Sequence, residues 1–304
     1  MASSGRVPAT CLAVAGLVFI GCGDGDPPVS DVGTYAVGTM SATFVDESRG
    51  TPAVRGLPAG PTRSVVTDFW YPAEGDASAP PSADAPSADG PFPLIVYNHG
   101  QQGEPAQYAP SFELWASAGY VVAAPRHPLT VRGGPGVRFA EDAEGEIGDI
   151  PFVISMVTGE FGDLADADRL AVAGHSSGAI ASYMVTFDEC CRDDRVDALV
   201  VNSLAAVAAD GEPAEGAGGT PTLFVHGTAD QNPIEGPRAV YAEADEPKFF
   251  LTVEGGDHSM MYRDGPAAPA VAAATLAFFD LVLKGHGDAA DRLRDIEGME
   301  ADID

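Results

Sequence analysis

The sequence predicts an α/β fold, with a mostly parallel central sheet flanked by helices. Short apolar runs that are typical of buried strands recur along the chain, and a glycine-rich turn, Gly174–Gly178, joins one of them to a helix-like segment. The length of 304 residues suits one such domain with a substantial core. The strand-like runs are Ser64–Tyr71, Pro93–Asn98, Arg169–Ala173, Asp197–Asn202, Thr222–Gly227 and Phe249–Val253.

The N-terminus has the pattern of an export signal. An apolar run over 11–20 is too short to span a membrane and fits the apolar core of a signal peptide. The stretch 19–22 resembles a bacterial lipobox, which would make Cys22 the lipidated first residue of the mature chain. We therefore expect a signal peptide over 1–21, a tether over 22–33 and an exported lipoprotein held at the membrane by its lipid anchor only. Ordinary secretion, or release into the periplasm, is the alternative.

A single domain is expected over 34–284. Within it, 74–90 is a low-complexity stretch with few apolar anchors, which we interpret as a mobile loop inserted between two strands. Ala267–Leu283 is alanine-rich and amphipathic, which predicts a helix that covers the sheet, with Gly285 as its C-cap. The acidic tail over 285–304 is expected to be partly frayed.

The charge balance excludes one class of partner. The chain has 16 basic and 45 acidic residues, a formal net charge of −29. Nucleic-acid binding requires a basic face for the phosphates, so no nucleic-acid partner is expected. The acidic surface would suit high salt, but a genome rich in G and C explains the same composition equally well.

The glycine-rich turn has the form G-x-S-x-G, with Ser176 at its centre. A serine on a sharp turn between strand and helix is presented above the sheet edge, and the glycines remove Cβ atoms that would clash in that turn. Ser176 is therefore the candidate nucleophile. The alternative is a glycine-rich connection without chemistry.

A base and an acid follow in the order that such a serine requires. Asp230 and His258 each come after a predicted strand, so the chain order is Ser, Asp, His. Serine needs a base to take its proton and a carboxylate to hold that base in one tautomer, which are the roles we expect for His258 and Asp230. Asp230 could instead cap a helix that starts near Pro233, His258 could be an ordinary loop histidine, and Asp257 is a rival acid.

The remaining histidines are weaker candidates. We expect His175 to pack locally beside the nucleophile and His226 to be structural, whereas His127 and His286 have no chemical context in the sequence. No pair of histidines has metal-ligand spacing and no H-E-x-x-H motif is present. The sequence therefore predicts no catalytic metal and no cofactor.

An oxyanion hole is expected beside the nucleophile. The run Pro93–Asn98 leads into a His-Gly turn, and the backbone N–H groups of Gln101 in that turn and of Ser177 after the nucleophile are the candidate donors. The alternative is a plain strand-ending turn.

These motifs resemble those of the α/β-hydrolase superfamily, in particular the branch of platelet-activating-factor acetylhydrolases and dienelactone-hydrolase-like esterases. The resemblance covers roughly 34–284 and implies the α/β-hydrolase fold and a serine esterase. Dienelactone hydrolases proper use cysteine where this chain has Ser176, and polyester-degrading relatives place an aromatic residue where it has Gln101. The segments that carry the resemblance are Asp68–Pro72, Pro91–Val96 with His99 and Gly100, Asp149–Ile154 and Asp168–Ser176.

The resemblance implies hydrolysis of short-acyl or phospholipid-type esters through an acyl-enzyme. A polyester hydrolase and a catalytically inactive exported binding lipoprotein are the alternatives. About twenty residues separate the runs 197–202 and 222–227, which predicts an open or lightly covered cleft and no large lid. The segment 131–142 could form one wall of the cleft or be a solvated loop. The adjacent Cys190 and Cys191 are expected to be free thiols, with a vicinal disulfide as the alternative.

Overall fold

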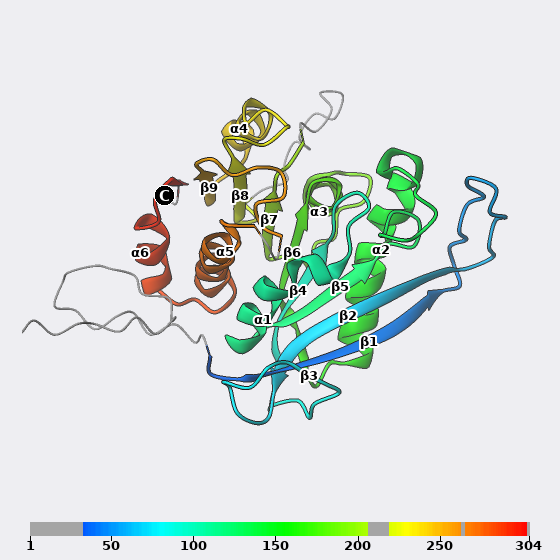
Figure 1. Cartoon of the computed structure of the whole chain (residues 1–304), viewed down its shortest axis with the longest axis horizontal. Helices are drawn as coiled ribbons and strands as arrows, with labels where there is room; N and C mark the ends of the chain where they lie inside the picture. Colours follow the sequence, from blue (N-terminus) through cyan, green and yellow to red (C-terminus); the bar gives the residue numbers. More distant parts are fainter. Residues whose placement is uncertain (1–32, 206–218, 263–264, 303–304) are drawn as a thin grey trace, which may run out of the picture.

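A computed structural model describes residues 33–205, 219–262 and 265–302, and within them the chain forms one ten-stranded sheet covered by helices (Figure 1). The strand order is β10-β9-β8-β7-β6-β4-β5-β2-β1-β3. The strands are β1 (Ala36–Asp46), β2 (Arg63–Ala73), β3 (Ser82–Ala83), β4 (Phe92–Asn98), β5 (Val121–Arg126), β6 (Ala165–His175), β7 (Ala198–Asn202), β8 (Thr222–Gly227), β9 (Lys248–Val253) and β10 (Met299–Asp302).

The middle of the sheet is parallel, as the sequence predicts. Strands β5, β4, β6, β7, β8 and β9 pair in parallel, while β1, β2 and β10 join antiparallel at the two edges. Parallel neighbours require crossovers, and helices supply most of them. The helices are η1 (Pro105–Tyr108), α1 (Ala109–Ser117), α2 (Phe139–Glu160), α3 (Ser177–Phe187), α4 (Glu235–Glu243), α5 (Ala268–Leu283) and α6 (Asp288–Arg294).

Helices cover both faces of the sheet, so its central strands are apolar throughout. In β4, Leu94 and Val96 pack toward α2 and α3, whereas the alternate residues Ile95 and Tyr97 pack toward α1 and α5. Side chains alternate across a strand, and a sheet covered on both sides therefore needs apolar residues at every position. This is why the central strands appear in the sequence as continuous apolar runs.

Residues 285–302 of the acidic tail form regular structure, where the sequence suggested partial fraying. Its residues form α6 and then β10, which pairs antiparallel with β9 and so covers that strand's outer edge. Leu293 is fully buried, and the Arg292 guanidinium donates to the Asp280 carboxylate of α5 at 2.9 Å. In Figure 1, α6 lies beside α5. Charge-rich composition suggested fraying, but a few apolar anchors and an edge strand in need of a partner outweigh it.

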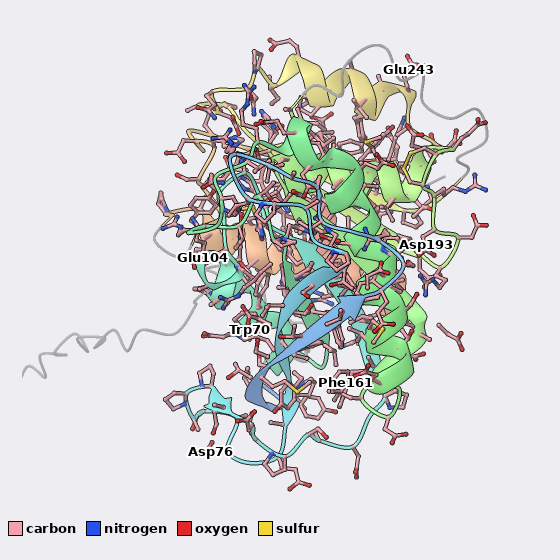
Figure 2. The ribbon with its side chains drawn as sticks, turned by 90° about the vertical axis from the view of Figure 1, so that its right-hand side faces the viewer. Trp70, Asp76, Glu104, Phe161, Asp193 and Glu243 are labelled. Carbon is pink, nitrogen blue, oxygen red and sulfur yellow. A yellow bond between two sulfur atoms is a disulfide. The ribbon has the colours of Figure 1, made fainter. Side chains whose placement is uncertain are left out.

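The insertion over 74–90 is also attached to the domain, whereas the sequence suggested a mobile loop. It contributes β3, which pairs in parallel with β1, and the Tyr71 hydroxyl donates to the carbonyl of Ala85 at 2.8 Å. Figure 2 shows this segment, labelled at Asp76, at the end of the molecule opposite Glu243 of α4. The insertion therefore extends the sheet beyond β1, at the edge opposite β10.

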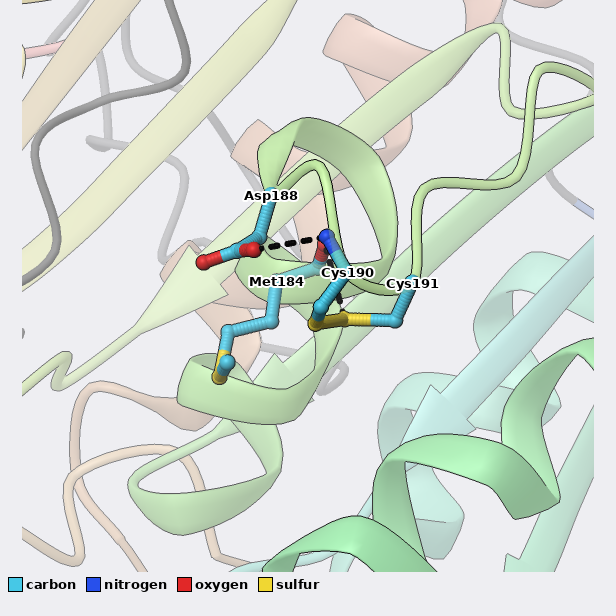
Figure 3. Close-up of a disulfide and its surroundings, with 4 residues drawn as sticks. All are labelled: Met184, Asp188, Cys190 and Cys191. Carbon is cyan, nitrogen blue, oxygen red and sulfur yellow. Dashed lines mark hydrogen bonds between the residues drawn. A yellow bond between two sulfur atoms is a disulfide. The ribbon is translucent and has the colours of Figure 1, made fainter.

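The two adjacent cysteines form a disulfide, so the expectation of free thiols is wrong. Cys190 and Cys191 follow α3 and are joined to each other (Figure 3). The backbone N–H of Cys190 donates to the Asp188 carboxylate at 2.9 Å, and the Cys191 sulfur lies 3.8 Å from the carbonyl oxygen of Met184. The loop that ends the helix brings the two sulfurs together, which spacing alone does not reveal.

Several expectations concern residues outside the described ranges. The signal peptide, Cys22 and nearly all of the tether lie within 1–32, and most of the β7–β8 connection lies within 206–218. None of the described helices is both long and apolar enough to cross a membrane.

Candidate active site

The turn from β6 to α3 presents Ser176 at the carboxyl end of the sheet. Ser176 has φ 54° and ψ −118°, a conformation that side-chain-bearing residues rarely adopt. A Cβ at Gly174 would collide with the carbonyl oxygen of Gly178, and one at Gly178 would collide with the carbonyl oxygen of Asn98. The G-x-S-x-G pattern is thus a steric requirement of this turn.

The structure brings Ser176, His258 and Asp230 together from three separate loops. His258 Nε2 lies 2.9 Å from Ser176 Oγ, and His258 Nδ1 lies 2.9 Å from each carboxylate oxygen of Asp230. Asp230 follows β8 and His258 follows β9, so neighbouring parallel strands deliver both to the same edge. With Nδ1–H donated to the carboxylate, Nε2 is left as the acceptor for the serine proton.

The surroundings of Asp230 favour its ionised form. Burial raises the pKa of this carboxyl, but hydrogen bonds from the Asn232 N–H, at 2.8 Å, and from His258 outweigh burial and leave its pKa below the usual value. A carboxylate that stays charged holds the imidazole in one tautomer and stabilises the imidazolium formed during proton transfer.

The alternative roles for these residues do not fit the geometry. Asp257 accepts hydrogen bonds from the backbone N–H and hydroxyl of Ser259, both at 2.9 Å, and has no bond to His258 among those that the structure gives it. Helix α4 begins at Glu235 after Ile234, so Asp230 lies outside its cap.

The turn after β4 lies against the nucleophile. A Cβ on Gly100 would lie 2.9 Å from His175 Nδ1 and 3.1 Å from Ser176 Cβ, so a larger residue would push these groups apart. Within the described residues, the backbone N–H groups of Gln101 and Ser177 donate no hydrogen bond. The first N–H groups of a helix lack partners inside the helix, which leaves that of Ser177 free to face a ligand. Two unpaired N–H groups beside Ser176 are what an oxyanion requires.

The side chain of Gln101 has a second role that the sequence did not indicate. Its amide nitrogen donates to the carbonyl of Val137 at 2.7 Å, and its amide oxygen accepts the N–H of Phe139 at 2.6 Å. The segment 131–142 is therefore attached to the oxyanion turn, and its last residues form the start of α2. This differs from a solvated loop. An amide flanked by two backbone groups of the same distant segment fixes the turn from outside.

Two of the other histidines lie beside the site. His175 Nε2 is 2.7 Å from the carbonyl oxygen of His258, and His226 Nε2 is 2.9 Å from that of Asn232. Both contacts support the loops that carry the triad, consistent with the local and structural roles expected for these residues. His127 lies deeper, with Nδ1 3.1 Å from an Asp149 carboxylate oxygen, a context that the sequence did not reveal.

The described residues contain one group of potential metal ligands, formed by Asp188, Cys190 and Cys191. Its two sulfurs belong to the disulfide, so they are not thiolate ligands. This group follows the far end of α3 from Ser176.

Comparisons with known proteins agree with this architecture. A family model described as chlorophyllase matches residues 73–212, which include the oxyanion turn and Ser176 but end before Asp230 and His258. No protein in the curated set matches the chain. Among solved structures, a ferulic acid esterase from Streptomyces cinnamoneus superposes with a TM-score of 0.68 at 23% sequence identity, over 83% of this chain and 91% of that one. The strand order, the nucleophile turn and this structural likeness show that the chain has the α/β-hydrolase fold.

Proposed function

We propose that the protein is a serine-dependent carboxylic-ester hydrolase. The observation that carries the proposal is the position of His258, whose two ring nitrogens each lie 2.9 Å from a partner, Ser176 Oγ on one side and the Asp230 carboxylate on the other. This is the arrangement in which a hydroxyl becomes a nucleophile at neutral pH.

The reaction proceeds in two halves. Ser176 Oγ attacks the ester carbonyl while His258 takes its proton, and the N–H groups of Ser177 and Gln101 bind the oxygen on which negative charge develops. Collapse of the tetrahedral intermediate expels the alcohol, which His258 protonates, and leaves an acyl group on Ser176. Water, activated by the same histidine, then releases the acid.

The substrates proposed are short-acyl or phospholipid-type esters, in keeping with the resemblance noted in the sequence. Nineteen residues separate Asn202 from Thr222, too few for an independent cap domain, so a polyester chain is the second candidate substrate. A panel of p-nitrophenyl esters of increasing acyl length, with a methyl ferulate, a phospholipid and a polyester film, separates these classes. A sharp preference for short acyl chains supports the first, and release of soluble products from the film supports the second.

Labelling with a fluorophosphonate probe tests the catalytic proposal itself. Ser176→Ala should abolish labelling and lower ester turnover by about 10⁶-fold, to near background. Ser177→Ala removes the neighbouring hydroxyl but keeps its backbone N–H, and should still be labelled. A wild-type protein that neither reacts with the probe nor hydrolyses any ester would instead support the inactive binding lipoprotein.

Export and anchoring are proposed on the N-terminal pattern. If Cys22 is lipidated, the mature chain begins there and its acyl chains hold it at a membrane, since each buried CH₂ contributes about 0.8 kcal/mol. Intact-mass analysis of protein recovered from a bacterial membrane fraction, with Cys22→Ser as the matched variant, decides between this and plain secretion. An unmodified N-terminus downstream of Cys22 would rule out the anchor.

A further inference from the structure

Two buried residues beside the triad, His175 and Tyr108, connect parts of the site that are far apart in the sequence. His175 occupies the position before the nucleophile, and Tyr108 ends η1 after the oxyanion turn. The Tyr108 hydroxyl lies 3.0 Å from His175 Nδ1 and 3.3 Å from the backbone nitrogen of Gly100, while His175 Nε2 lies 2.7 Å from the carbonyl oxygen of His258.

The direction of every hydrogen bond in this chain follows from its two ends. The carbonyl of His258 can only accept, so His175 Nε2 must carry the proton. A neutral ring then has an acceptor at Nδ1, which receives the Tyr108 O–H. The Tyr108 oxygen in turn accepts the N–H of Gly100. The chain therefore runs one way, from the oxyanion turn to the loop that carries the base.

The environment keeps this arrangement fixed across the working pH range. Burial, aided by the neighbouring His258, lowers the pKa of His175 to about 3, so its ring stays neutral. Burial also raises the pKa of Tyr108 well above the usual value, so its hydroxyl stays protonated. The ring of Tyr262 packs edge-on against both residues, with centroids 5.2 Å from His175 and 5.4 Å from Tyr108.

We infer that His175 and Tyr108 are positioning residues that hold the oxyanion turn and the His258 loop in fixed relation to Ser176. The inference rests on the proposed esterase function and assigns a role to the variable residue of the G-x-S-x-G turn. Gln101 directly follows Gly100, so a displacement of Gly100 also moves the Gln101 N–H. Displacement of the His258 carbonyl likewise moves the ring that accepts the serine proton.

Among the hydrogen bonds that the structure gives them, neither residue bonds to Ser176 Oγ or to a ring nitrogen of His258, although the His175 ring packs against the His258 ring with centroids 4.9 Å apart. The loss of either residue should therefore impair turnover rather than binding. A misplacement of about 1 Å at a catalytic group costs up to about 100-fold in rate. Tyr108→Phe removes only the hydroxyl and should lower kcat for p-nitrophenyl acetate by about 10- to 100-fold, with KM little changed. The rate of fluorophosphonate labelling should fall in parallel.

Tyr71→Phe is the matched control. Tyr71 is also a buried tyrosine whose hydroxyl is hydrogen-bonded, in its case to the Ala85 carbonyl, but it lies on β2 near the 74–90 insertion. If a lost buried hydrogen bond acted only through stability, the two variants would show similar melting temperatures and similar kcat. The inference requires that kcat falls in Tyr108→Phe alone.

Two substitutions of His175 separate its two links. In His175→Gln the side-chain amide reaches the place of Nε2 and can still donate to His258, but the acceptor for Tyr108 is lost. In His175→Asn the amide oxygen replaces Nδ1 and the link to His258 is lost. Combining Tyr108→Phe with His175→Gln should therefore cost no more than one of the two changes, whereas combining it with His175→Asn should multiply the losses.

The outcomes are distinguishable from failure of the esterase proposal. A wild-type protein that shows neither turnover nor labelling would refute the function. Active wild-type protein with unchanged kcat in folded Tyr108→Phe and His175→Gln would refute the positioning role. Equal losses of kcat in Tyr108→Phe and Tyr71→Phe would refute it as well, and if Tyr108→Phe does not fold, the two His175 variants decide.

Discussion

Two histidine–aspartate pairs of the described residues, His258 with Asp230 and His127 with Asp149, have different surroundings, and the esterase proposal uses only the first as a base. His258 pairs with Asp230 at the carboxyl end of the sheet, and its side chain is 22% exposed. His127 pairs with Asp149 beneath α2, and both side chains are fully buried. The two histidines differ in the hydrogen-bonding partner of the second ring nitrogen, Nε2.

His258 offers its second nitrogen to the hydroxyl of Ser176, which can donate, so that nitrogen can remain an acceptor. His127 Nε2 instead lies 3.2 Å from the side-chain oxygen of Asn98. The orientation of Asn98 is fixed, because its amide nitrogen donates to the Ala173 carbonyl and to the Ser182 hydroxyl.

Both nitrogens of His127 therefore face acceptors, which favours the doubly protonated imidazolium. Burial lowers the pKa of His127, but the negative charges of Glu146 and Asp149 outweigh burial and raise it above the usual value. A cation with no lone pair cannot accept a proton. The same type of residue pair is thus the proposed base at the carboxyl end of the sheet and part of a structural charge cluster in the interior.

Two arginines complete the charge cluster around His127, whose members are His127, Asp142, Glu146, Asp149, Arg49 and Arg63. The guanidinium of Arg63, 1% exposed, donates to Asp149 at 2.6 and 2.8 Å and to Asp142 at 2.8 and 3.2 Å. Arg49 adds a contact to Asp149 at 3.1 Å. These ion pairs tie strand β2, which begins at Arg63, and the loop after β1, which carries Arg49, to α2, where Asp142 and Asp149 lie. A buried charge is tolerated only where such partners compensate its lost hydration.

Replacing the aspartate of each pair should give opposite phenotypes, and this is the largest effect we expect. Asp230→Asn should lower kcat by about 10⁴-fold with KM little changed, because the amide no longer fixes the imidazole tautomer. Asp149→Asn should leave kcat per folded molecule near that of the wild type but destabilise the fold. Steady-state kinetics and thermal unfolding of both variants test this contrast.

Asp257→Asn is the control for the acid assignment. It changes the residue adjacent to His258 but removes only local bonds to Ser259, so its effect on kcat should be small. A larger loss in Asp257→Asn than in Asp230→Asn would overturn the assignment of the acid.

The sequence predicted the candidate site at the carboxyl ends of the strands, but it did not predict the buried charge cluster. Ser176, Asp230 and His258 each follow an apolar run, and parallel strands necessarily bring their carboxyl ends to one edge. Arg63, Asp149 and His127 come from β2, α2 and the loop after β5, and nothing in the spacing of charged residues indicates that they are buried. Charged residues are usually exposed, so the expectation fails where ion pairs form in the interior.

Conformations of loops and tails were also beyond sequence reasoning, and for a related reason. The many acidic residues of the tail suggest fraying. Its structure is instead determined by the buried Leu293 and by the edge of β9, with which β10 pairs. Gln101 was singled out for its backbone N–H, whereas its side-chain contacts to 137 and 139 depend on how a distant segment folds back. Tertiary contacts determine all of these features.

Breaking the charge cluster at its arginine should be the second largest effect. Arg63→Met removes the cation that Asp142 and Asp149 share and leaves the buried Asp142 carboxylate without its arginine partner, which should cost about 3–5 kcal/mol of unfolding free energy. Arg63→Lys keeps the charge but replaces the planar fork by one ammonium group, and should cost less. Chemical denaturation measures both, and a stability of Arg63→Met equal to that of the wild type would mean that the cluster is not a structural element.

The smallest effect concerns Asp46, at the rim of the same cluster, and it depends on pH. Burial raises the pKa of this carboxyl, but hydrogen bonds from Ser48 and Arg49 outweigh burial and lower its pKa from 3.8 to about 2. Because the folded-state pKa lies below that of the unfolded chain, the charged form stabilises the fold above pH 3.8, and this contribution is lost as the pH falls through about 2.

Asp46→Asn keeps the shape of the side chain but cannot ionise, so its melting temperature should lie below that of the wild type at neutral pH. The gap should narrow as the pH falls from about 4 toward 2, because the wild-type carboxylate is then protonated as well. Melting curves at several pH values, with Asp89→Asn as an exposed control in the 74–90 insertion, follow this gap. A gap that stays constant with pH would show that Asp46 acts through the geometry of its hydrogen bonds and not through its charge.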